Sequence, residues 1–266
     1  MTALVDGWVV AKRNLIKIKR VPDLLIFSTI QPIMFVLLFA YVFGSAIKVP
    51  GTNDPAAYRE FLMAGIFTQT VAFGSSLTGM GLAEDMTKGI IDRFRSLPMS
   101  RAAVLIGRTT SDLLNNVLVV AVMVACGLLV GWRTHTNVLD VVAGFGLLFL
   151  FGYAMSWISA TIGLSVKSVE VAQSAGFIWM FPLTFLSNAF VPTEGMPTVL
   201  RTIADWNPVS AIVLALRQLW GNPGVEPTGS GFPVERPGLY SLLTIVAILV
   251  IFVPLSIRAY RRAASR

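Results

Sequence analysis

Six long runs of apolar residues constrain the fold of this 266-residue chain more than any other feature. They cover residues 24–44, 61–83, 113–132, 138–166, 171–191 and 239–257. A helix needs about 20 apolar residues to cross the roughly 30 Å hydrocarbon core of a bilayer. Only 13% of the residues are charged, against about 25% in a typical soluble domain. We therefore predict an all-α polytopic membrane protein with six transmembrane helices, in which residues 1–266 form a single transmembrane domain.

The positive charges predict the orientation of these helices, because Lys and Arg concentrate in cytoplasmic loops. With both termini in the cytoplasm, 15 of the 21 Lys and Arg residues fall on the cytoplasmic side and six on the outer side. This bias predicts a multi-pass protein of the plasma membrane with cytoplasmic N- and C-termini. It also accounts for the net charge of +7, so we expect the lipid bilayer, and no nucleic acid, as a partner.

The segment before the first span is predicted to be an N-terminal amphipathic helix in the membrane interface. Its apolar stripe consists of Val5, Trp8, Val9, Leu15 and Ile16. Lys and Arg residues between positions 12 and 20 supply positive charge, so the helix is expected to lie flat on the cytoplasmic surface. Pro22 ends it, because proline removes a hydrogen-bond donor. The alternative is an ordinary basic segment next to the membrane.

The loop between the second and third predicted spans contains a second amphipathic pattern. Its apolar residues fall on one helical face: Ile90, Ile91, Phe94 and Leu97. Pro98 ends this short helix. The apolar face can lie on the membrane or fit into a groove on another protein. Four apolar residues in register argue against the alternative of a solvated basic loop.

The long outer segment from residue 192 to 238 is too apolar for a free loop. Val199, Leu200, Ile203 and Trp206 form an apolar stripe. After Pro208, residues 209–220 again have a helical, apolar pattern that Gly221 ends. Each helix is shorter than a span, so we predict an extracellular re-entrant or interfacial helical hairpin at the outer leaflet. Residues 222–237 are rich in Gly and Pro and are predicted to be an exposed loop.

The middle of each predicted span lacks Asp, Glu, Lys and Arg. Ion-coupled carriers usually need an ionisable relay there, so this absence argues against secondary transport. Asn115 and Asn116 lie deep enough in the third span to face protein or a cavity. Arg108 and Asp112 can pair at i, i+4, although we favour ordinary interfacial polarity for Arg108. Other uncharged polar residues can line a cavity or hold helices together: Gln31, Gln69, Gln173, Thr184, Ser187 and Asn188.

The sequence predicts no catalytic site. It lacks a G-x-x-x-x-G-K-[ST] phosphate loop, an H-E-x-x-H zinc motif and a G-x-S-x-G nucleophile motif. The only cysteine is Cys126, in an apolar run, and the only histidine is His135. We therefore expect no internal disulfide and no metal site, and a protein that is not an enzyme.

Two stretches of the sequence are distinctive. The first is FPLTFLSNAFVP at residues 181–192, followed by Met196-Pro197 and by Trp206-Asn207-Pro208. The second is MTKGIIDRFRSLPMS at residues 86–100. Together they resemble the ABC-2-type exporter permeases, and within that family the daunorubicin-resistance permeases. The resemblance extends over essentially the whole chain and includes the six-span layout.

The resemblance implies the permease subunit of an ATP-driven exporter in the bacterial inner membrane, which moves a hydrophobic or amphipathic drug or antibiotic out of the cytoplasm or inner leaflet. It implies a homodimer in which each permease binds a separate ATP-binding cassette subunit. ATP and Mg would be held by that partner, and this chain would carry no cofactor. By similarity, the cytoplasmic coupling helix seated in the ATPase would contain Lys88, Ile90, Ile91, Arg93, Phe94, Arg95 and Leu97.

The resemblance also implies a substrate route near the second and fifth spans. The candidate pathway residues are Phe67, Gln69, Phe73, Phe177, Trp179, Phe185 and Asn188. The hairpin would close the route on the outside, with Leu200, Ile203, Trp206 and Asn207 as the extracellular gate. Two alternatives stay open: an exporter of a lipid or lipid-linked glycan, because aromatic rings also stack on sugars, and an ATP-independent channel or membrane scaffold.

Overall fold

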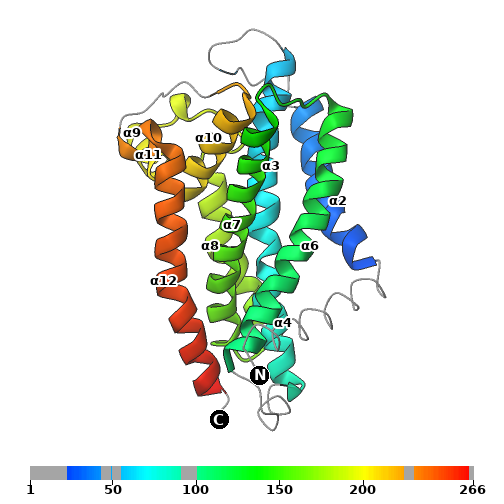
Figure 1. The fold of residues 1–266 in the computed structure, drawn as a ribbon, viewed down its shortest axis with the longest axis vertical. Coiled ribbons are helices and arrows are strands. Elements are labelled where there is room, and N and C mark those ends of the chain that lie inside the picture. The colour runs from blue at the N-terminus through cyan, green and yellow to red at the C-terminus, as the bar shows by residue number, and fades with distance from the viewer. Residues whose placement is uncertain (1–22, 43–48, 50–54, 91–100, 225–230, 264–266) are drawn as a thin grey trace.

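The computed structural model is all-helical, without strands, in the residues that it describes, which are 23–42, 49, 55–90, 101–224 and 231–263. The helices form an elongated bundle (Figure 1). Helices α9 (Thr198–Asp205), α10 (Pro208–Trp220) and α11 (Phe232–Glu235) gather at one end. Helices α4 (Ser76–Thr87) and α12 (Pro237–Ala263) end at the other.

Three further helices connect these two ends. They are α6 (Arg101–Val130), α7 (Val138–Gly163) and α8 (Val169–Phe185). Two of them begin at a side-chain cap: Asn137 accepts a hydrogen bond from the Asp140 N–H at 2.8 Å, and Ser168 accepts one from the Val171 N–H at 3.3 Å. Such caps satisfy N–H groups that have no partner within the helix.

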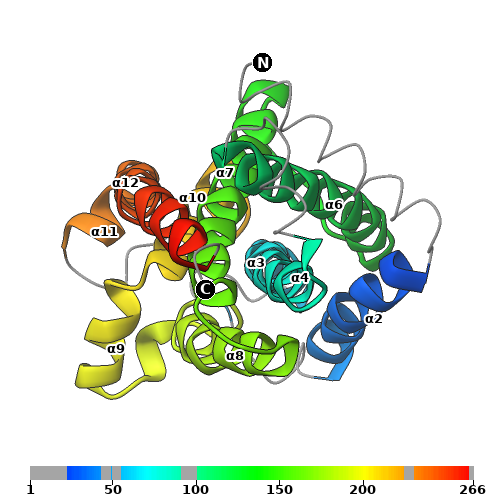
Figure 2. The ribbon, with the colours of Figure 1, turned by 90° about the horizontal axis from the view of Figure 1, so that it is seen from below.

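The centre of the bundle is one long segment made of α3 (Pro55–Gly74) and α4. Seen along the bundle in Figure 2, the helices α6, α7 and α8, together with α2 (Asp23–Leu37), surround this segment, and α12 lies on the far side of α7. Most of it is therefore buried, whereas only a small part of α12 is buried. Helix α4 approaches α7 closely, because a Cβ on Gly163 would lie only 2.1 Å from the Gly79 carbonyl oxygen.

Four helical segments in the described residues are long and apolar enough to cross a membrane: Ala57–Thr87, Val104–Val130, Val138–Gly163 and Pro237–Arg262. Helices α9 and α10 meet at 66° and could count as a fifth, broken span. Gly221 ends α10 in the left-handed conformation, with φ +67°, as the sequence predicted. The outward faces are apolar, for example at Leu129, Ile178 and Val250, which suits contact with lipid.

The prediction of a multi-helix membrane protein is confirmed, but several predicted boundaries are wrong. The run 61–83 belongs to a longer segment, and the run 113–132 to a helix that begins at Arg101. The run 171–191 is helical only to Phe185, so α8 has 17 residues. The first run is the 15-residue α2, continued by the π-helix η1 (Leu38–Val42). At a rise of 1.5 Å per residue, α2 and α8 are each shorter than the roughly 30 Å bilayer core.

Two predicted elements lie outside the described residues. One is the N-terminal amphipathic helix, before residue 23, and the other is most of the amphipathic helix in the loop 84–98. Of that second helix, the structure describes the residues up to Ile90.

Candidate functional site

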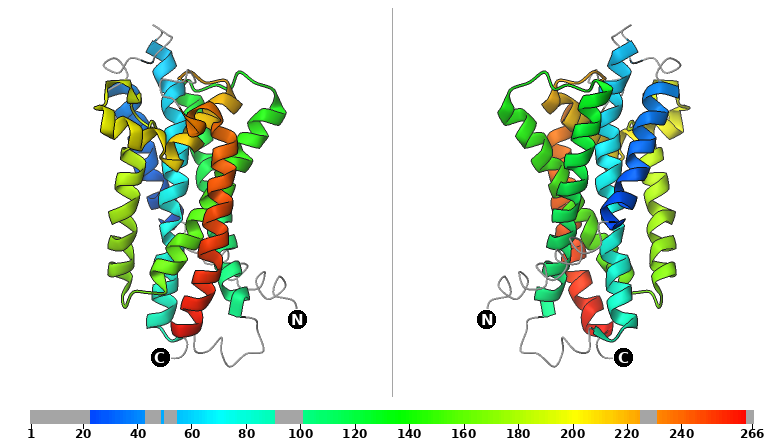
Figure 3. Two further views of the ribbon diagram at one scale, coloured as in Figure 1. Left: turned by 90° about the vertical axis from the view of Figure 1, so that its left-hand side faces the viewer. Right: turned by 90° about the vertical axis from the view of Figure 1, so that its right-hand side faces the viewer.

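A cavity of about 200 Å³, here called the chamber, lies between α2, α3, α4, α6 and α8. Its walls are Gln31, Pro32, Phe35, Gln69, Thr70, Phe73, Gly74, Ser76, Leu77, Met80, Asn115, Asn116, Val119, Gln173 and Phe177. Gln69 and Asn116 are buried near the middle of their membrane-crossing segments. Gln31 on α2 and Gln173 on α8 are exposed, and these two helices lie on the same side of α3 and α4 in both views of Figure 3. The exposed part of the wall therefore lies between α2 and α8.

The chamber contains hydrogen-bonding groups that have no partner. Five amide side chains line it, and none of them makes a hydrogen bond to another residue in the described part of the chain: Gln31, Gln69, Asn115, Asn116 and Gln173. The Gln69 Nε2 and Asn116 Nδ2 atoms are buried donors without an acceptor among those residues. A buried polar group left unpaired costs about 1–3 kcal/mol. These two nitrogens have no exposed surface, whereas Gln31 and Gln173 are exposed and offer hydrogen-bonding groups to a guest.

The other wall of the chamber is aromatic. Phe73 on α3 and Phe177 on α8 lie 5.7 Å apart between ring centroids. These two rings belong to a row of neighbouring rings, here called the phenylalanine series, whose adjacent centroids lie 5.1–5.8 Å apart. The series begins and ends at the chamber wall and consists of Phe73, Phe177, Phe181, Phe185, Phe190, Phe39 and Phe35. These spacings are those of favourable ring pairs. A flat aromatic molecule would find similar partners along the whole series.

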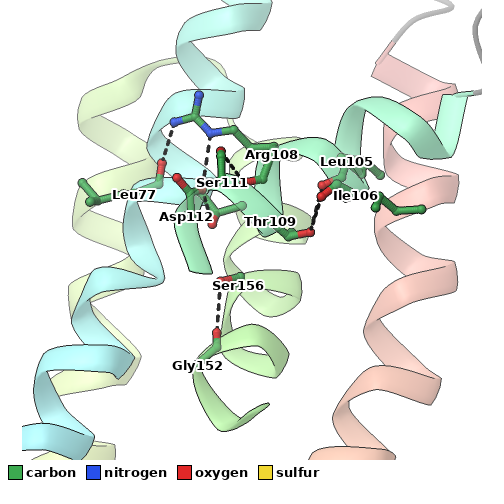
Figure 4. Close-up of polar contacts among 10 residues, drawn as sticks. Leu77, Leu105, Ile106, Arg108, Thr109, Ser111, Asp112, Gly152 and Ser156 are labelled. Atoms are coloured by element: carbon green, nitrogen blue, oxygen red, sulfur yellow. Dashed lines mark hydrogen bonds and ion pairs between the residues drawn. The ribbon is translucent and has the colours of Figure 1, made fainter. Parts of the chain in front are cut away.

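Arg108 and Asp112 form an ion pair within α6, and hydrogen bonds of both residues tie α6 to α4 beside the chamber (Figure 4). The Arg108 Nε donates to Asp112 Oδ2 at 3.3 Å, and the Arg108 Nη2 donates to the carbonyl oxygen of Leu77, itself a wall residue, at 3.3 Å. Thr78 donates to the same carboxylate oxygen at 2.6 Å. Gly81 leaves room for the guanidinium, because a Cβ there would lie 1.7 Å from Nη2. The i, i+4 pairing is confirmed, but Arg108 holds two helices together and is not ordinary interfacial polarity.

Arg217 on α10 is a fully buried cation, within the helical segment 209–220 that the sequence predicts on the outer side. Its Nε donates to the Phe61 carbonyl oxygen at 3.0 Å, and its Nη2 donates to the Asn188 carbonyl oxygen at 2.9 Å and to that of Ala189 at 3.4 Å. The guanidinium carbon lies 3.5 Å from the centre of the Phe61 ring. Arg217 therefore binds the segment that follows α8 to both α3 and α10. A single charge within an apolar helix was the signal that could have revealed it.

Asn207, one of the predicted gate residues, holds the hairpin to α8. Its side chain accepts from the Val209 N–H at 2.8 Å and so caps α10. Its Nδ2 donates to the carbonyl oxygens of Leu183 and Leu186, both at 2.7 Å. It thereby satisfies carbonyls at the end of α8, where the helix offers no further N–H.

The other predicted gate residues lie on the surface. Leu200, Ile203 and Trp206 are exposed on α9. The Trp206 carbonyl accepts a hydrogen bond from the Tyr240 hydroxyl at 2.9 Å, which connects α9 to the start of α12.

The structure brings only part of the predicted pathway together. Gln69, Phe73 and Phe177 line the chamber, and Phe185 continues the phenylalanine series. Phe67 is not in this group: it lies in an interior cluster with Trp132, Phe145 and Trp220. Trp179 packs against the core, and Asn188 accepts from Arg217. Asn115 and Asn116, which were predicted to face protein or a cavity, line the chamber, as do Gln31 and Gln173.

Only two of the predicted coupling residues, Lys88 and Ile90, lie among the residues that the structure describes. Lys88 lies just past α4, where it pairs with Glu84, and this hydrogen bond and negative charge raise the pKa of Lys88 above its ordinary value. Ile90 is half-buried. Ile91, Arg93, Phe94, Arg95 and Leu97 lie outside the described residues. No group of three or more His, Cys, Asp or Glu residues that could hold a metal ion occurs in the described part of the chain.

Comparison with known proteins places this bundle in a family. The sequence model of the ABC-2 type transporter matches residues 6–220. The chain belongs to the ABC-2 type transporter family. This membership and the apolar helices make it a multi-pass membrane protein and a permease subunit of an ABC transporter, and they confirm the resemblance described above.

Several relatives are similar over most of their length. The daunorubicin resistance ABC transporter permease protein DrrB1 of Streptomyces coeruleorubidus is 34% identical, over 94% of this chain and 83% of that protein. The probable doxorubicin resistance ABC transporter permease protein DrrC of Mycobacterium tuberculosis is 24% identical, over 90% and 82%. The putative transport permease ycf38 of Porphyra purpurea is 25% identical, over 90% and 81%.

Proposed function

We propose that this permease exports a hydrophobic or amphipathic drug through the chamber and along the phenylalanine series. The chamber is the observation that carries this proposal, because it combines apolar aromatic walls with unpaired amides and has no charged wall residue. Such a lining suits a small organic molecule. The names of two similar proteins, which mention daunorubicin and doxorubicin resistance, point to the same class of cargo.

In the proposed topology, the protein crosses the plasma membrane six times and both termini lie in the cytoplasm. Helix α2 with η1, and α8, would be the two short spans, which the bilayer can accommodate by local thinning. The 15 to 6 distribution of Lys and Arg supports this orientation. The α9–α10 hairpin would then be a re-entrant element at the outer leaflet, with Leu200, Ile203, Trp206 and Asn207 as the gate.

The energy source in this proposal is a separate ATP-binding cassette subunit, which would hold ATP and Mg. The helix that includes Lys88, Ile90, Ile91, Arg93, Phe94, Arg95 and Leu97 would be seated in that subunit, and two permeases would form a homodimer. ATP binding would draw the two coupling helices together, the permease halves would rock, and the cargo would move outward. The amphipathic pattern of residues 90–97 supports a docking role.

The first test is the native mass of the gently solubilised, tagged protein from its own host. Two permeases with two ATPase subunits would support the proposal, and a second, related permease in the complex would replace the homodimer by a heterodimer. A lone permease dimer, reproducible in mild detergents and in lipid discs, would contradict ATP coupling and favour a channel or scaffold.

The second test uses Phe94→Asp, which places a charge on the predicted docking face. Drug efflux from cells and drug-stimulated ATP hydrolysis should both be lost, while membrane insertion is unchanged. Asp92→Asn, on the other face of the same predicted helix, is the matched control and should keep both activities. Efflux by Phe94→Asp at the level of the unaltered protein would rule out the coupling assignment.

A further inference from the structure

We infer that a second cavity, at the end of the bundle where α4 and α12 finish, binds an anionic phospholipid. Its phosphate would lie between Lys167 and Arg262, and an acyl chain would follow the surface of α12. This cavity is separate from the chamber, and the inference goes beyond the proposed function because it concerns neither the cargo nor the ATPase. The proposed topology places this end at the cytoplasmic face of the membrane, where anionic lipids attract basic residues.

The cavity, here called the basic cavity, has a volume of about 470 Å³. It lies between the end of α4, the loop that joins α7 to α8, and the last turns of α12. Its apolar walls include Met86, Leu164 and Ala259, which belong to or pack against a hydrophobic cluster. Lys167 and Arg262 also line it, and both are exposed. Apolar walls next to two cations suit an amphiphile with a negatively charged headgroup.

The charges around the basic cavity favour an anion. No Asp or Glu occurs among the described residues that line it. The carboxylates closest in sequence are engaged or buried: Glu84 pairs with Lys88, Glu170 accepts a hydrogen bond from Ser168, and Asp85 is buried. A phosphate group between the two cations at the wall would therefore receive charge-assisted hydrogen bonds without competition from a carboxylate in the wall.

The surface that continues from the basic cavity favours a lipid over a soluble anion. Ile251, Leu255, Ala259 and Arg262 follow one another at i, i+4, i+8 and i+11, so they share one face of α12. Ile251 is 52% exposed and Leu255 39% exposed. An acyl chain can lie along about 12 Å of this face while its headgroup reaches Arg262. A free phosphate would make no use of these apolar contacts.

The experiment titrates the delipidated full permease in mild detergent with lipid and counts the bound molecules by native mass spectrometry. The probes are dioleoyl phosphatidylglycerol, which is anionic, and dioleoyl phosphatidylcholine, whose choline group cancels the phosphate charge. Each Lys or Arg near an anionic lipid contributes about fivefold in affinity. Two such cations should make the first phosphatidylglycerol bind about 25-fold more tightly than the first phosphatidylcholine.

Lys167→Gln and Arg262→Gln should each reduce this preference about fivefold, and the double variant should abolish it. Ala259→Leu keeps both cations but fills the basic cavity, so it should also abolish the preference. Arg261→Gln is the matched control, because it removes the same charge from an exposed neighbour that does not line the cavity. In about 0.5 M ammonium acetate, which screens exposed charges beyond about 4 Å, this control should change the preference less than about twofold.

Three results would overturn the inference. The first is equal binding of the two lipids to the unaltered protein. The second is a preference for phosphatidylglycerol that both Ala259→Leu and the double variant retain, because the attraction would then come from elsewhere on the surface. The third is displacement of the lipid by soluble glycerol 3-phosphate at equal affinity, because the site would then be one for a free phosphate. The titration needs neither the ATPase nor the cargo, so its failure would leave the proposed function untouched.

Discussion

Replacement of Arg217 by methionine tests whether a buried cation holds the hairpin end of the bundle together. Methionine keeps an unbranched apolar side chain and removes the guanidinium. The change removes the hydrogen bonds to the carbonyls of Phe61, Asn188 and Ala189, at 3.0, 2.9 and 3.4 Å. The carbonyls of Asn188 and Ala189 lie after the end of α8, so no helical N–H replaces the lost donor.

The change in stability follows from two stabilising contributions that the variant loses and one cost that it no longer bears. The two shorter hydrogen bonds to a charged donor contribute about 3–6 kcal/mol together. The contact of the guanidinium with the Phe61 ring, 3.5 Å from its centre, adds about 2 kcal/mol in a desolvated site. The buried charge costs several kcal/mol, and the variant no longer bears this cost. The net expectation is a loss of about 2–3 kcal/mol, or a fall in Tm of about 4–12 °C at about 2–4 °C per kcal/mol.

The assay is thermal unfolding of the purified protein in mild detergent, followed by tryptophan fluorescence. The Tm of Arg217→Lys should lie between those of Arg217→Met and the unaltered protein, because a compact ammonium cannot reach the carbonyls on both sides as the planar guanidinium does. Arg236→Met, at an exposed arginine, is the control and should change stability by less than about 0.5 kcal/mol. A Tm for Arg217→Met at or above that of the unaltered protein would refute the reasoning, because the cost of burying the charge would then dominate.

Two further substitutions test the packing by the same unfolding assay. Asn207→Ala should lower the free energy of unfolding by about 2–3 kcal/mol, because it removes a helix cap and leaves two carbonyls unpaired. Asn137→Ala, the control, removes only a cap and should lower it by about 1 kcal/mol. Equal losses in the two variants would show that the link from Asn207 to α8 contributes nothing. Gly163→Ala should lower Tm, because its Cβ meets the backbone of Gly79 and overpacking costs about 1–3 kcal/mol. Gly146→Ala, in the same helix with open space around it, should be neutral or stabilising, and a similar loss in both would refute the close contact of α4 with α7.

The helices themselves were predictable because local chemistry determines where most of them begin and end. The α9–α10 hairpin followed from the apolar pattern, from Pro208 at the start of α10 and from Gly221 at its end. The end of α8 was not predictable in this way, since residues 186–191 are as apolar as the helix before them. The helix ends where two residues more than 20 positions away supply donors: Asn207 to the carbonyls of Leu183 and Leu186, and Arg217 to that of Asn188 just beyond the helix.

The side chains that meet in the chamber were also not predictable from the sequence. The sequence identified a set of amides that could line a cavity, but not which of them converge. Phe67 and Phe73 illustrate the reason, because six positions on a helix place them about 120° apart around its axis. One therefore packs into the interior cluster of tryptophans, and the other lines the chamber. Only the arrangement of the neighbouring helices distinguishes these two faces.

Helix α8 links the chamber to the hairpin. Gln173 and Phe177 on its first turns form part of the chamber wall, and the carbonyls of Leu183 and Leu186 at its other end are bound by Asn207. Because both sets of residues lie on one 17-residue helix, a shift of the hairpin that preserves these hydrogen bonds would also move the wall between α2 and α8, unless α8 bends at Pro182. The geometry therefore provides a direct mechanical connection by which opening at one end of the bundle would change the chamber at mid-depth, without a separate relay of charged residues.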